Sequence, residues 1–126
     1  MSENGLRMLG VVFAFLLVFG TGFYLTHFGR PYGVALFTVH KLVATGILVF
    51  LGVNIYKIYK TPALGGSAWL LVSLAVLAFV VMIASGSVLS AVKSSPVVIA
   101  AIHKVVSYVT VLLAIAAFYL LLWRSP

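Results

Sequence analysis

The sequence predicts an all-α integral membrane protein, an up-down-up-down bundle of four transmembrane helices made of two pseudo-symmetric helical hairpins. Hydrophobic residues make up 64% of the 126 residues, and charged residues make up only 7%. The mean hydropathy is +1.28, far above that of an ordinary soluble domain. The sequence also divides into four long apolar stretches separated by short segments that contain proline.

Each apolar stretch is long enough to cross the hydrocarbon core, which takes about 20 residues of helix. We expect spans at about 6–26, 33–59, 67–92 and 96–123, all in one transmembrane domain that occupies residues 1–126. The first stretch is long enough to span the bilayer, so we expect it to be a retained helix rather than a cleaved signal. The connections are short and therefore join antiparallel neighbours. They contain Pro31, Pro62 and Pro96, near helix starts where a missing N–H costs little.

The charged residues restrict the partners of the chain. The formal net charge is +7, but most basic residues lie at the ends of apolar runs, where Lys and Arg contact lipid headgroups. We therefore expect a lipid bilayer and no nucleic acid as partner. The chain has no cysteine, which excludes disulfides, thiolate metal sites, iron–sulfur clusters and covalently attached haem.

The basic residues also predict an orientation, because cytoplasmic loops carry an excess of Lys and Arg. The side that holds both termini has more of them than the opposite side, which has Arg30 and Lys93. We therefore expect the termini in the cytoplasm and the protein in the cell inner membrane. The basic residues on the terminal side are Arg7, Lys57, Lys60 and Arg124.

The two halves of the chain, 1–60 and 67–126, form an internal repeat. The segment from Thr21 to Thr26 and the segment from Ser85 to Ser90 share the pattern small-Gly-x-x-Leu-hydroxyl. Each is followed by a connection with a proline and then by the dipeptide His-Lys. Two spans separate equivalent positions, so the halves are parallel and imply a pseudo-two-fold axis along the membrane normal.

The repeated histidines, His40 and His103, are the main candidates for function. Ionisable residues inside a membrane span are costly, and they usually face the bundle interior and mark functional sites. The second and fourth helices of such a bundle are diagonal, and neighbouring axes lie about 8–10 Å apart. Two imidazoles that reach inward across that diagonal can bind one iron. We therefore predict His40 and His103 as the metal ligands of one haem per chain.

Three small residues are predicted to line the cofactor. Gly22 lies nine residues before Pro31 and His40 nine residues after it, so a hairpin brings both to the same depth. Gly86 has the equivalent position in the second half. Glycine leaves room for the close approach of a planar group, and Ser107 continues the face of the fourth helix that bears the second histidine. Close helix packing is the alternative role for both glycines.

Lys41 and Lys104 are predicted to pair with the haem propionates, because each follows a histidine and lies near one end of the bundle. Lysines in this position can also extend to the headgroups as interface anchors. His27, beside a glycine of the first connection, is expected to be an exposed interface residue.

These residues carry a resemblance to a known group of proteins. A glycine-bearing helix that faces a helix with an inward histidine, twice in four spans, resembles the membrane b-type cytochromes, with Gly22, Gly86, His40 and His103 as the matching residues. The resemblance implies haem b and electron transfer with a quinone or a redox partner protein. It implies an electron-transfer protein or redox subunit rather than a stand-alone enzyme.

The chain departs from the commoner pattern of those families, in which one helix bears two histidines. Asn54 stands 14 positions after His40 and cannot replace an imidazole on iron. One haem does not cross a core about 30 Å thick. A homodimer or larger complex would therefore have to complete a transmembrane electron path.

Two other functions remain open. The Lys-His pairs suit a small transporter or binding protein for an anionic or quinone-like ligand, and the chain also suits a cofactor-free accessory subunit of a membrane complex. Exporters that resemble the small multidrug family depend on an intramembrane glutamate, whereas Glu3 is the only acidic residue here. Hydrolysis is not supported, because no carboxylate or thiol is available inside the membrane to complete a nucleophile–base set.

Overall fold

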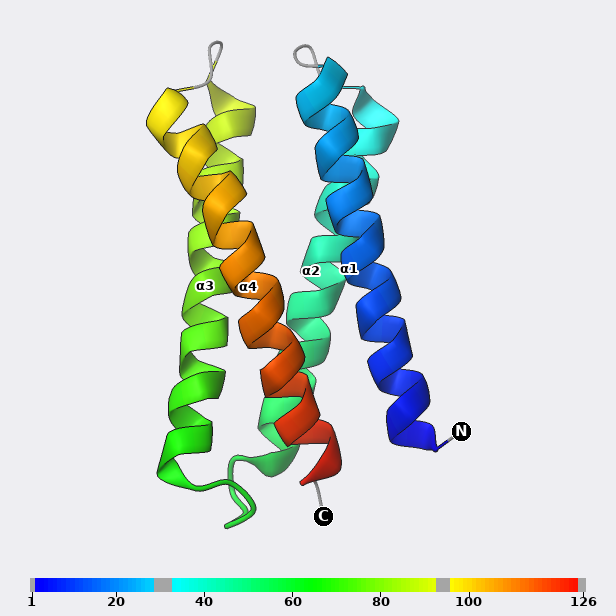
Figure 1. Cartoon of the computed structure of the whole chain (residues 1–126), viewed down its shortest axis with the longest axis vertical. Coiled ribbons are helices and arrows are strands. Elements are labelled where there is room, and N and C mark those ends of the chain that lie inside the picture. The colour runs from blue at the N-terminus through cyan, green and yellow to red at the C-terminus, as the bar shows by residue number, and fades with distance from the viewer. Residues whose placement is uncertain (1, 29–32, 93–95, 125–126) are drawn as a thin grey trace. The chain divides into compact units, whose positions relative to one another are not determined.

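A computed structural model describes residues 2–28, 33–92 and 96–124. Over these residues the chain forms the helices α1 (Glu3–Phe28), α2 (Val34–Ile58), α3 (Gly66–Ala91) and α4 (Val97–Trp123) (Figure 1). Each helix ends within three residues of its predicted boundaries. The helices contain 25 to 27 residues, or about 38–40 Å at 1.5 Å per residue, which exceeds the hydrocarbon thickness. The predicted all-α architecture is confirmed.

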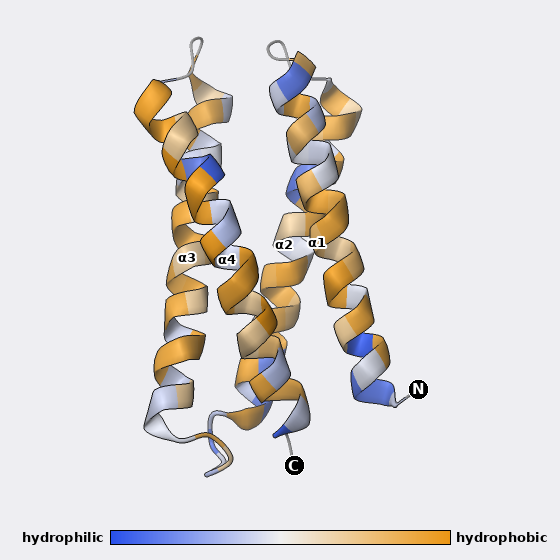
Figure 2. Ribbon diagram, in the orientation of Figure 1, coloured by the Kyte–Doolittle hydropathy of each residue, from blue (hydrophilic) through white to orange (hydrophobic). Residues whose placement is uncertain are grey.

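All four helices are long and apolar enough to cross a membrane. Figure 2 shows hydrophobic residues along nearly the whole length of each one. Many large apolar side chains are exposed, including Leu42, Leu70 and Leu112. In water such a surface would be a large association site, whereas in a bilayer it is the surface that contacts lipid. The chain is therefore an integral membrane protein.

The chain consists of two compact units, residues 1–60 and 61–126. Helix α1 packs against α2 in the first unit, and α3 packs against α4 in the second. We call these units the first and the second hairpin. The predicted internal repeat stays a prediction. The pseudo-two-fold arrangement of the hairpins and the complete bundle stay predictions.

The core of the first hairpin lies in the half nearer the N-terminus of α1. Val11 and Phe15 of α1 are buried, as are Ile47, Leu51 and Ile58 of α2. The spacing of three or four residues places each set on one face of its helix. Aromatic and branched side chains therefore supply the buried apolar surface in this part of the hairpin.

Small residues are prominent in the core of the second hairpin. Ala75 of α3 and Ala114 and Ala117 of α4 are fully buried, and Thr110 is nearly so. Small side chains let helices approach closely in lipid, where packing rather than water exclusion holds helices together. The hydroxyl of Thr110 donates to the carbonyl of Val106 at 2.7 Å within α4. No polar group of this residue is therefore left unpaired in the membrane.

The helix starts follow from residues that favour extended backbone. Gly33, Gly65 and Pro96 precede α2, α3 and α4 with extended dihedral angles, and none of them caps its helix with a side chain. Pro96 thus confirms the expected proline at a helix start. Pro31, like Arg30 and Lys93, lies outside the described residues.

Core packing in the second hairpin is testable with two leucines of α4. Leu121 is 1% exposed and Leu112 is 73% exposed. Leu121→Ala should lower the free energy of unfolding by about 2 kcal/mol. This value is at the low end for buried leucines, because in lipid the lost side chain was not being removed from water. The measurement is circular dichroism during titration with sodium dodecyl sulfate. Leu112→Ala is the matched control, and an equal loss in both variants would contradict the described packing.

Candidate functional site

The imidazole of His40 is held by the preceding helix of its own hairpin. Its Nδ1 atom lies 2.9 Å from the hydroxyl oxygen of Thr21 and 3.0 Å from the carbonyl oxygen of Val18, both on α1. These contacts join α2 to α1 at the depth predicted from the position of Gly22. The histidine is half-buried. Its ring orientation is therefore set by the hairpin itself.

The hydrogen bonds of His40 determine which ring nitrogen carries the proton. The carbonyl of Val18 can only accept, so Nδ1 of the neutral ring is the donor. The Thr21 hydroxyl lies 2.8 Å from the Leu17 carbonyl and donates within α1, which leaves its oxygen as a second acceptor for the Nδ1 proton. Nε2 is consequently the unprotonated nitrogen, and its lone pair is available to a metal.

The second hairpin repeats this arrangement with serine in place of threonine. Nδ1 of His103 on α4 lies 2.8 Å from the hydroxyl oxygen of Ser85 on α3. The Ser85 hydroxyl also lies 3.2 Å from the carbonyl of Met82 within α3, to which it can donate. Ser85 is 6% exposed, which places this bond in a region shielded from solvent and lipid.

Gly22 and Gly86 make room for the histidine rings. A Cβ atom on Gly22 would lie 3.2 Å from Cε1 of His40, and one on Gly86 would lie 3.1 Å from Cε1 of His103. Both distances are shorter than ordinary van der Waals contact. The predicted juxtaposition of each glycine with its histidine is therefore present, and the imidazole occupies the space that a side chain would take. Contact of these glycines with a porphyrin stays a prediction.

The lysines that follow the histidines are exposed. The ammonium of Lys41 lies 4.3 Å from the centroid of the Phe37 ring, one turn nearer the start of α2. This cation–π contact shows the side chain extending toward the end of the hairpin, as expected for a lysine that reaches the membrane surface. Ser107 donates to the carbonyl of Lys104 within α4. Pairing of either lysine with a propionate, and contact of Ser107 with haem, stay predictions.

Two further polar residues lie apart from the histidines. His27 is exposed at the end of α1, where its ring meets the edge of Phe28, as expected for an interface residue. Asn54 is 5% exposed, and its amide donates to the carbonyl of Phe50 at 2.8 Å in α2. Neither residue contributes to the histidine contacts.

Sequence analysis missed the partners that orient the histidines. The repeated pattern contains Thr21 and Ser85 without indicating their role, although a hydroxyl 18 or 19 residues before a histidine is a usable signal. The Val18 carbonyl has no side-chain signature and could not be found in this way. Among the described residues there is no group of three or more His, Cys, Asp or Glu side chains suited to hold a metal ion. A metal held by two histidines needs no such group.

The comparisons with known proteins do not identify the chain. No protein-family model matches it, and neither a curated protein nor a solved structure matches it.

The close contact between Gly22 and His40 is testable. Gly22→Ala should push the ring away from α1 by a few tenths of an ångström and weaken the Nδ1 hydrogen bonds. Gly20→Ala is the matched control, because no atom lies within 4 Å of a Cβ built there. Alanine favours helix by about 1 kcal/mol over glycine, so the control should be neutral or stabilised. We expect Gly22→Ala to be about 1 kcal/mol less stable than the control in detergent unfolding, and equal stability would contradict the contact.

Proposed function

We propose that the protein is a b-type cytochrome in which His40 and His103 ligate one haem b, and that it acts in membrane electron transfer. The observation that carries the proposal is the state of the two imidazoles. In each hairpin Nδ1 is engaged by oxygen atoms of the preceding helix, at 2.8–3.0 Å. Metal-bound histidines commonly donate their other ring N–H to such an acceptor.

The donor set fits haem b better than other metal groups. Two neutral imidazoles with Nε2 lone pairs are the usual axial ligands of low-spin haem in membrane cytochromes, whereas the chain lacks the cysteines needed for covalent attachment. A zinc ion would need three or four protein ligands. When bound, haem supplies a one-electron carrier whose potential depends on the axial ligands and their hydrogen bonds.

The surrounding residues would prepare the histidines for this role. Hydrogen bonds from Nδ1 to oxygen fix the ring orientation and raise the basicity of Nε2. Gly22 and Gly86 allow the rings to lie against the backbone of the preceding helix. Lys41 and Lys104 are the nearest cations in sequence to each ligand, and they would neutralise the propionates near the membrane surface.

The remaining functional assignments belong to the same proposal. A single haem suits a redox subunit that exchanges electrons with a quinone or a redox partner protein, in a homodimer or a larger complex. The excess of basic residues on the terminal side favours termini in the cytoplasm and the protein in the inner membrane.

Haem ligation is tested by three histidine variants. Protein purified from a haem-competent host should show a sharp Soret band and, on reduction, an α band. His40→Ala and His103→Ala should each abolish this six-coordinate spectrum, because both rings are required. His27→Ala is the matched control and should leave the spectrum unchanged, since that residue is exposed at the end of α1.

The alternatives predict different results for the same preparation. A colourless, folded protein would contradict the haem proposal and favour an accessory subunit or a binding protein for an anionic or quinone-like ligand. A spectrum that survives either His40→Ala or His103→Ala would also contradict ligation by the pair.

The role of the hydroxyl partner is tested by Thr21→Val, which keeps the shape of the side chain but removes the oxygen that accepts from His40. Loss of such a partner commonly weakens metal binding 10–100-fold. Because the Val18 carbonyl remains, we expect about a tenfold loss of haem affinity and a more positive midpoint potential. Thr26→Val is the control, since that hydroxyl donates only within α1, to the carbonyl of Gly22. Unchanged affinity and potential in Thr21→Val would contradict a positioning role.

A further inference from the structure

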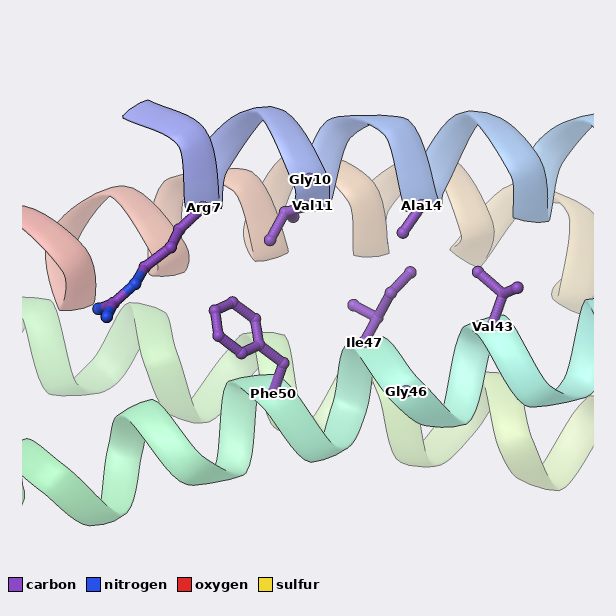
Figure 3. Close-up of a pocket in the computed structure, with 8 residues that line it drawn as sticks. All are labelled: Arg7, Gly10, Val11, Ala14, Val43, Gly46, Ile47 and Phe50. Atoms are coloured by element: carbon purple, nitrogen blue, oxygen red, sulfur yellow. The ribbon is translucent and has the colours of Figure 1, made fainter. Parts of the chain in front are cut away.

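A groove of about 450 Å³ lies between α1 and α2 in the first hairpin, away from the histidine. Its α1 side is formed by Gly10, Val11 and Ala14 (Figure 3). Across from them lie two branched side chains of α2, Val43 and Ile47. The volume falls in the range of about 300–1,000 Å³ that is usual for small-molecule sites. Apart from Arg7 at one end, the lining residues are all apolar.

Small residues keep this groove open. Gly10 and Gly46 line opposite walls, and no atom lies within 4 Å of a Cβ built on either one. The lining residues extend from position 7 to 14 on α1 and from 43 to 50 on α2, or about 10 Å along each helix. The trough therefore lies parallel to the helices and can hold part of an extended hydrocarbon chain.

Cations lie at the end of the groove nearer the N-terminus. The side chain of Arg7 extends from α1 toward α2 beside Phe50 (Figure 3). Lys57 follows Phe50 by seven residues, which is two turns, and so continues the groove-lining face of α2. A guanidinium and an ammonium thus lie at the level where a spanning helix meets the headgroups. Arg7 forms an ion pair with Glu3, but that carboxylate is 76% exposed, and pairs of this kind are weak.

We propose that this groove binds an anionic phospholipid, with one acyl chain along the trough and the phosphate at Arg7 and Lys57. The charges distinguish this occupant from the others. A second copy of the chain has one acidic side chain, Glu3, which is already paired, and so brings little negative charge to the cations. A neutral quinone or a zwitterionic lipid would leave the net positive charge unmatched. The proposal does not depend on haem.

Native mass spectrometry of the full-length protein in detergent tests the headgroup. Phosphatidylglycerol and phosphatidylcholine with identical acyl chains are titrated separately, and the first should bind more tightly. Each cation near a membrane surface accounts for about a fivefold change in affinity. Arg7→Gln and Lys57→Gln should each weaken phosphatidylglycerol binding by about that factor, whereas Glu3→Gln should strengthen it. Arg124→Gln, at the end of the second hairpin, is the charge control.

The trough is tested by filling it. Gly10→Leu should reduce binding of phosphatidylglycerol, whereas Gly20→Leu should not, because Gly20 lies on α1 outside the groove and also has open space around it. Equal binding of the two lipids, or full binding by Gly10→Leu, would overturn the proposal. The proposal would also be overturned if Gly10→Leu abolished a dimer without loss of lipid binding. Binding of a neutral quinone that Arg7→Gln leaves unchanged would overturn it as well. If either leucine variant fails to fold, Arg7→Gln and Lys57→Gln still decide the test.

Discussion

Hydrogen bonding of the imidazole N–H is the constraint that organises both hairpins. A polar group inside the hydrocarbon region has no water to bond, and leaving it unpaired is costly. In the first hairpin the Nδ1 proton of His40 meets two oxygens of α1, at 2.9 and 3.0 Å. In the second, His103 meets the hydroxyl of Ser85 at 2.8 Å. Each bond fixes the depth and rotation of one helix against the other, and a glycine beside each ring makes the approach possible.

The same bonds connect the fold to the proposed chemistry. A ring whose Nδ1 is committed to oxygen presents Nε2 as a base, which is the form that binds iron. A purely structural histidine in one hairpin would not require an equivalent ring in the other hairpin, also followed by lysine. The recurrence of one contact set in both hairpins is therefore the main support for a shared ligand.

Much of the fold follows from the sequence because the bilayer restricts the options. Apolar length alone located the four helices to within three residues. The pairing of Gly22 with His40 followed from equal spacing about Pro31. The role of this pairing did not follow from the sequence, because an open space next to a backbone suits an imidazole as well as a porphyrin. The Val18 carbonyl and the groove beneath Arg7 depend on how two helices diverge, which residue periodicity does not determine.

The most direct test of the account is electron paramagnetic resonance of the oxidised protein, combined with the haem content per chain. Two Nδ1-bonded histidines on one iron predict one haem per chain and a low-spin ferric signal typical of two imidazole ligands. That signal should be lost when either His40 or His103 is replaced. A high-spin signal, or a low-spin signal that persists with only one of these histidines, would contradict the central claim.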